Sequence, residues 1–275
     1  YAPAGGDDRA IIVLWIGNND SSAAALGSGG ENPTFIPVPF EQIEPEIKGS
    51  LRILANVAKQ QGILSTDAYT VASIERNLTR LTDFEAQYAH VLDRLRTEST
   101  FAAGNADLFL LTLPYYSSVG YLIDSEDLEY YLRKLNPAYA VPPTFARVAP
   151  SGQPIVDPLL GDRISLLTFG FMYSLLHTGY SVEYVNQVLE IGGVQRDDMV
   201  LSQAEQAFIR SRIDGFNDVI GTLGASMPER VHVIDIGTLL NQTLTGQIVV
   251  EVGGKPFTRK WTRGGAFSLD GVHPR

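Results

Sequence analysis

Residues 10–20 read Ala-Ile-Ile-Val-Leu-Trp-Ile-Gly-Asn-Asn-Asp, an apolar run that ends in a small polar cluster. A continuous apolar run that contains β-branched residues and is closed by Gly and Asn predicts a strand over 10–16, buried on both faces. Strands of that kind belong to parallel sheets, whose ligands bind beyond the carboxyl ends of the strands. We therefore expect Gly17 to Asp20 to lie at a ligand site.

The chain after this strand alternates between helical and strand patterns. Residues 21–39 are rich in small residues and predict a long loop, and 41–61 has the spacing of an amphipathic helix. Two capping-box patterns, beginning at Thr82 and at Ser202, each predict the start of a helix. The pattern of helix followed by buried strand predicts an α/β fold with a doubly wound parallel sheet.

Two further strands and a hairpin complete that pattern. Buried strands are predicted over 106–113 and 231–236, and a hairpin over 248–252 followed by a Gly-Gly pair. The stretch 115–200 interrupts the rhythm with six tyrosines within 115–139, six prolines within 137–158 and an apolar run at 164–176. We interpret it as an insertion packed over one end of the sheet. Its tyrosines either line a substrate cleft or are half-buried packing residues.

Composition and charge exclude several classes of protein. The chain has 275 residues, 21 basic against 31 acidic side chains and a formal charge of −10, which argues against a nucleic-acid or anionic-membrane surface. The absence of cysteine excludes disulfides, thiolate catalysis and Cys-ligated zinc. No apolar stretch is long enough for a transmembrane segment. Both ends appear cut, so we expect a segment of a longer or processed protein.

Two pairs of residues carry possible chemistry. Asp270 lies three residues before His273, a spacing that lets a carboxylate orient an imidazole in a tight turn. Gly17 and Asn19 supply a backbone N–H and a side-chain amide, the donors that an oxyanion hole needs. Each pair alone also fits an ordinary turn. The other histidines, His90, His177 and His232, are interpreted as structural.

Together the two motifs, Leu-Trp-Ile-Gly-Asn-Asn-Asp at 14–20 and Gly-Gly-Ala-Phe-Ser-Leu-Asp-Gly-Val-His-Pro at 264–274, resemble blocks of the SGNH/GDSL hydrolases, in particular a secreted bacterial branch. The resemblance implies a three-layer α/β/α flavodoxin-like fold, with 1–275 as one partial domain and an insertion at about 115–200. It implies hydrolysis of carboxylic esters through an acyl-serine intermediate, without a metal or cofactor.

The same resemblance assigns roles by position. Asn19 would donate to the oxyanion, Gly17 would belong to the same turn, and Asp20 would hold the loop. Asp270 and His273 would be the orienting acid and the general base. The expected partner is a small-molecule, lipid or carbohydrate ester, and the expected location is secreted, periplasmic or cell-envelope. The sequence leaves the oligomeric state open.

The sequence departs from the family at its nucleophile. No Gly-Asp-Ser block occurs, the nearest being Gly161-Asp162-Arg163 in the wrong place, and the helix expected after His-Pro is missing. Either the nucleophilic serine lies upstream of residue 1, or the chain is a non-catalytic SGNH-like module that binds carbohydrate or acyl groups. An acyltransferase with the same site is a third possibility.

Overall fold

A computed structural model describes residues 10–26, 69–98, 101, 104–148, 161–227, 229–267, 271 and 272. The side chains of Ala23 and Glu98 are excepted. The helix predicted over 41–61 lies outside the described residues, as do Asp270 and His273. The described residues form a mixed α/β structure around a parallel three-stranded sheet, as the alternating pattern predicted.

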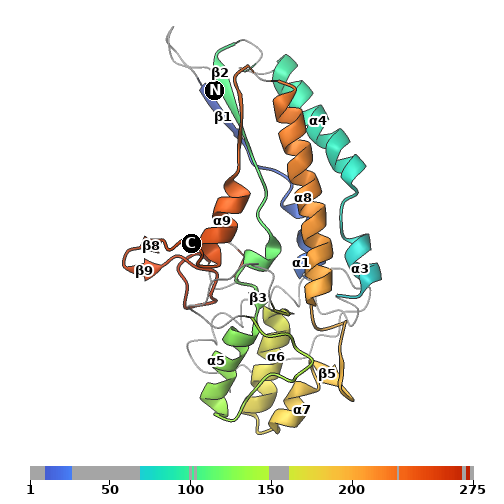
Figure 1. The fold of residues 1–275 in the computed structure, drawn as a ribbon, viewed down its shortest axis with the longest axis vertical. Coiled ribbons are helices and arrows are strands. Elements are labelled where there is room, and N and C mark those ends of the chain that lie inside the picture. The colour runs from blue at the N-terminus through green and yellow to red at the C-terminus, as the bar shows by residue number, and fades with distance from the viewer. Residues whose placement is uncertain are drawn as a thin grey trace.

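The sheet contains β1 (Ala10–Leu14), β2 (Ala106–Leu111) and β7 (Val231–Ile234), in the order β1-β2-β7. Both pairings are parallel, with Ile12 opposite Leu108 and Leu110 opposite Val233. The carboxyl ends of all three strands therefore lie at one edge, which points toward α5 and α6 in Figure 1.

The long helix α8 (Gln203–Ala225) packs on one face of this sheet, and α4 (Leu81–Glu98) packs beside it on α8 (Figure 1). The helices α1 (Asn19–Leu26) and α3 (Val71–Arg76) pack on α8 nearer the carboxyl end of the sheet. The strand order advances in a single direction, so right-handed crossovers put the connecting helices on the same side. The rings of Phe84 in α4 and Phe216 in α8 stack with centroids 4.2 Å apart, and they share one hydrophobic core with the fully buried Leu108 and Leu110 of β2.

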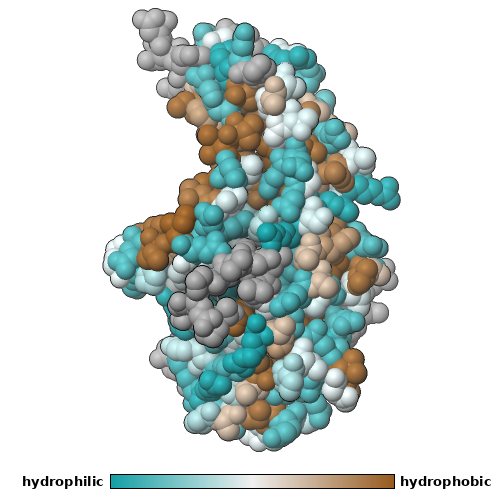
Figure 2. Space-filling model, in the orientation of Figure 1, coloured by the Kyte–Doolittle hydropathy of each residue, from teal (hydrophilic) through white to brown (hydrophobic). Residues whose placement is uncertain are grey.

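The opposite face of the sheet is open, which corrects the prediction of a strand buried on both faces. The side chains of Ile11 and Val13 are 70% and 58% exposed, and the strand is only half-buried along its length. β7 is also largely exposed rather than buried. Figure 2 shows apolar side chains gathered along this hollowed side of the molecule. An apolar run predicts a strand buried on both faces only where a layer of helices covers each face of the sheet.

The stretch 115–200 forms a compact subregion at the carboxyl end of the sheet (Figure 1). Its described elements are η2 (Tyr116–Ser118), β3 (Leu122–Ile123), α5 (Ser125–Leu135), β4 (Ile164–Ser165), α6 (Leu166–His177), α7 (Val182–Asn186), β5 (Glu190–Ile191) and β6 (Val194–Gln195). The apolar run at 164–176 is the buried helix α6, whose Phe169 packs edge-on against Trp261 with centroids 5.7 Å apart. The segment lies at the end of the sheet, and its being an insertion stays a prediction.

The C-terminal part follows β7 at the carboxyl end of the sheet (Figure 1). It consists of α9 (Ile236–Leu244) and a short hairpin of β8 (Glu251–Val252) and β9 (Lys255–Pro256). The predicted Gly-Gly turn is confirmed, because Gly253 and Gly254 both have positive φ. The hairpin strands are shorter than predicted.

Local helix signals were partly right. Ser202 forms the predicted capping box with Glu205, and Ile209 and Phe216 face inward, whereas Phe208 is exposed. The helix near Thr82 begins one residue earlier, at Leu81, so Thr82 is not its N-cap. The loop predicted over 21–39 begins instead as α1. Among the described residues, no helix has the length and apolarity to cross a membrane.

Candidate functional site

The Gly17 turn lies where the sequence predicted it, directly after β1. Gly17 has φ +111°, a conformation that side chains other than glycine rarely adopt. A Cβ at this position would come within 2.8 Å of the Phe84 ring and 2.9 Å of Leu113. The Asp20 N–H donates to the Gly17 carbonyl over 3.1 Å and closes the turn. Glycine is therefore required by both conformation and space.

Asn19 is the first residue of α1, and it is exposed at the carboxyl end of β1. Asp20 holds the turn in place through its backbone, because its carbonyl accepts from the Thr79 N–H over 2.9 Å. Ser21 follows with its side chain buried and its Oγ without a hydrogen-bond partner in the described part of the chain. Burial raises the pKa of the nearby Tyr116 hydroxyl to about 12.

Two asparagines hold the loop that follows β2. The side-chain oxygen of Asn217 in α8 accepts from the Leu113 N–H over 2.7 Å, and its amide donates to the Leu113 carbonyl over 3.1 Å. Asn241 in α9 accepts from the Tyr115 N–H and from the Ser118 hydroxyl, each over 2.9 Å. These bonds replace the ladder bonds that the backbone loses when β2 ends. The loop, residues 112–121, is therefore held in place, and we call it the platform.

The platform contacts residues of both the N-terminal and the C-terminal motif. Leu113 lies against Gly17, and α1 packs on η2. A few residues further on, the Tyr121 N–H donates to the Gly271 carbonyl over 2.8 Å. Gly271 has φ +73°, as the predicted Asp-Gly turn requires. The expected base and acid, His273 and Asp270, lie outside the described residues.

A buried ion-pair cluster fixes the segment that leads to this turn. The Arg259 guanidinium donates to the Asp124 carboxylate over 2.6 Å and to the Leu122 carbonyl over 2.5 Å. Lys260 adds a second ion pair to Asp124 at 3.1 Å. Burial alone would raise the pKa of the Asp124 carboxyl, but the neighbouring cations outweigh burial and hold that pKa well below its usual range.

Asp124 also caps α5, since its carboxylate accepts from the Asp127 N–H. Asp127 pairs with Arg263, whose guanidinium lies over the Tyr130 ring. Burial and the charge of Asp124 raise the pKa of the Asp127 carboxyl. The C-terminal segment is therefore attached to α5 by several charges at once.

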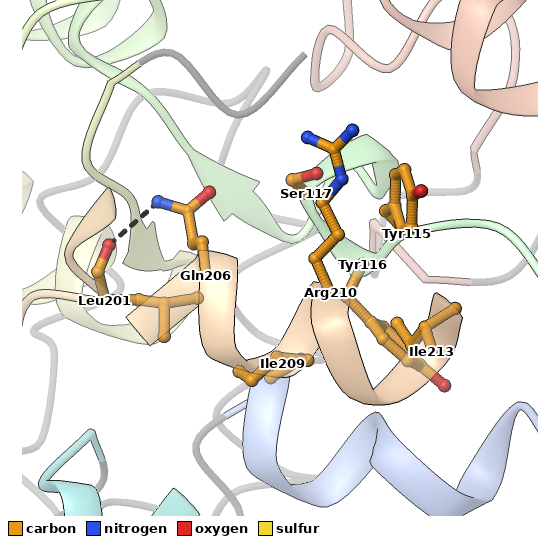
Figure 3. A pocket seen from close by; sticks show the side chains of 9 residues that line it. Tyr115, Tyr116, Ser117, Leu201, Gln206, Ile209, Arg210 and Ile213 are labelled. Atoms are coloured by element: carbon orange, nitrogen blue, oxygen red, sulfur yellow. Dashed lines mark hydrogen bonds between the residues drawn. The ribbon is translucent and has the colours of Figure 1, made fainter. Parts of the chain in front are cut away.

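A pocket opens beside the platform, between η2 and α8 (Figure 3). It is small, with a cavity volume of about 10 Å³, which is room for about one water molecule. The buried Gln206 amide donates to the Leu201 carbonyl over 3.1 Å, while its Oε1 has no partner within the described residues. The Ser117 hydroxyl is also buried and has no hydrogen-bond partner within the described residues. The lining residues are Ala25, Tyr115, Tyr116, Ser117, Leu201, Gln206, Ile209, Arg210 and Ile213.

Sequence reasoning placed Gly17, Asn19 and the Gly271 turn but missed the residues that hold them. Asn217 and Asn241 lie inside helices and carry no motif, so no local signal marks them. His232 was interpreted as structural; it stacks on Phe109 and its Nε2 lies 3.8 Å from the Asp107 carboxylate across the sheet. His177 stacks on Tyr173.

No protein-family model, curated protein or solved structure matches this chain.

Proposed function

We propose that the chain is part of a serine hydrolase of the SGNH/GDSL type, which cleaves carboxylic esters through an acyl-serine intermediate. The observation that carries the proposal is the hydrogen bond from the Tyr121 N–H to the Gly271 carbonyl, 2.8 Å long. It holds the centre of the Asp-Gly-x-His motif on the loop that also packs against Gly17. Two motifs separated by 250 residues therefore share one support.

The proposed chemistry follows from the residue types. His273 accepts the serine hydroxyl proton while the serine oxygen attacks the ester carbonyl carbon, and the carbonyl electron pair moves to oxygen. Asn19 donates to that oxyanion, and Asp270 orients the imidazole. Collapse of the tetrahedral species breaks the bond to the alcohol, which leaves with the proton from His273. Water then repeats the sequence and releases the acid.

The open edge of β1 supports a nucleophile supplied from upstream. Ala10 donates to the Asn105 carbonyl on the β2 side, so the N–H groups of Ile11 and Val13 point toward the outer edge. No strand in the described ranges pairs with that edge. A parallel strand added there would end beside Gly17, and its right-handed crossover helix would join the helices on the covered face rather than cover Ile11 and Val13. We propose that the serine lies at the end of such a strand.

The test uses the protein with the upstream sequence that its gene encodes. A fluorophosphonate probe should label one serine, and mapping should place it before residue 1. Asn19→Ala should lower kcat for a p-nitrophenyl ester by about 100- to 1000-fold with little change in KM. Asn18→Ala removes an amide from the variable position of the same turn and should change kcat little. His273→Ala with undiminished hydrolysis would refute the proposal.

A further inference from the structure

Gly120 lies close to the backbone of Arg259 and to that of Gly271, the glycine of the expected catalytic turn. A Cβ at this position would lie 2.8 Å from the Arg259 carbonyl oxygen and 3.5 Å from the Gly271 carbonyl oxygen. The φ of Gly120 is not in the left-handed region, so conformation alone does not require glycine. Space does require it, because the one atom within 3 Å, the Arg259 carbonyl oxygen, is backbone, while the Phe267 ring carbon would lie 3.4 Å away.

The Gly271 side of this contact is equally tight. A Cβ on Gly271 would lie 2.6 Å from the Tyr121 nitrogen, the atom that donates to the Gly271 carbonyl. Val272 packs against the main hydrophobic core directly afterwards. The turn is therefore seated on the backbone of Gly120 and Tyr121 and closed by an apolar contact.

The Arg259 side is immobilised by charge. The Arg259 guanidinium is 5% exposed and paired with Asp124, which is 2% exposed. The next residue but one is also held, since the Tyr131 hydroxyl donates to the Trp261 carbonyl over 2.6 Å. A segment anchored in this way cannot move aside to accept a side chain at position 120.

We propose that Gly120 and Tyr121, backed by the Arg259–Asp124 ion pair, form a seat that positions the turn carrying Asp270 and His273. The inference rests on the proposed function and assigns no chemical step to the seat. Gly120 acts by its missing side chain, and Tyr121 acts by its backbone N–H. Both are positioning residues, because neither has to touch the substrate.

The experiment compares Gly120→Ala with Gly221→Ala in the protein carrying its natural upstream sequence. Gly221 lies in α8, and a Cβ there meets nothing within 4 Å, so it is a matched control for the same chemical change. Gly120→Ala should raise hydrogen exchange in the peptide 264–275 by about tenfold or more, a local opening that leaves α8 protected. It should lower kcat for the p-nitrophenyl ester by up to about 100-fold with KM unchanged.

Gly221→Ala should change neither quantity. Gly271→Ala tests the same contact from the turn itself and serves if Gly120→Ala does not fold. Unchanged kcat in a folded Gly120→Ala or Gly271→Ala protein would overturn the seat, even if exchange increased. A parent protein that hydrolyses no ester and takes up no fluorophosphonate would instead refute the proposed function, so the two failures are distinguishable.

Discussion

Replacing Arg259 with methionine should destabilise the fold strongly, because it leaves the Asp124 carboxylate buried without its main partner. Arg259 and Asp124 are almost fully buried, and their ion pair is 2.6 Å long. Breaking a buried pair by removing one partner costs about 3–5 kcal/mol. Lys260 remains 3.1 Å from Asp124 and offsets part of the loss. The Leu122 carbonyl also loses a donor. We expect a loss of about 3 kcal/mol, near the lower end of that range.

The measurement is urea unfolding at pH 7, followed by circular dichroism. Arg96→Met is the matched control, because Arg96 pairs with Asp93 at 2.8 Å while both side chains are more than half exposed. Exposed pairs of this kind contribute about 0.5 kcal/mol or less. Methionine keeps most of the apolar stem in both variants, so the comparison isolates the charge.

The effect should also depend on pH. Because the folded-state pKa of Asp124 is depressed, the ion pair contributes fully above the unfolded-state pKa of about 4. That contribution is lost as the pH falls from there through the folded-state pKa. The difference between parent and Arg259→Met should therefore shrink below about pH 4. A cost at pH 7 no larger than that of Arg96→Met would refute the reasoning.

Two further stability predictions follow from the sheet and the helix caps. Leu108→Ala should lower the free energy of unfolding by about 2–5 kcal/mol, because Leu108 is fully buried. Val13→Thr on the open face should change that free energy by about 0.5 kcal/mol or less in the 275-residue chain. Equal costs in urea titrations would contradict an open face. Ser202→Ala should lower the free energy of unfolding by about 1 kcal/mol, because it removes the N-cap side chain of α8, and a thermal midpoint identical to that of the parent would show that the capping box is not formed.

The strands and their order of appearance were predictable because each is a short apolar run closed by a turn residue. The Gly17 and Gly271 turns were predictable for a related reason, since glycine next to Asn or Asp favours positive φ. The burial of β1 was not predictable. An apolar run indicates a strand but does not reveal which layers cover it, and Ile11 and Val13 are exposed although they are apolar.

The sequence by itself determined the local elements: strands over 10–16, 106–113 and 231–236, each two residues longer than in the structure, the Ser202 cap, and the two glycine turns. Each depends on neighbouring residues, whose preferences act over a few positions. Only the tertiary structure decided that the Tyr121 N–H meets Gly271 and that Arg259 pairs with Asp124. Those contacts join residues more than 130 positions apart in the chain, and their geometry arises from packing rather than from any local pattern.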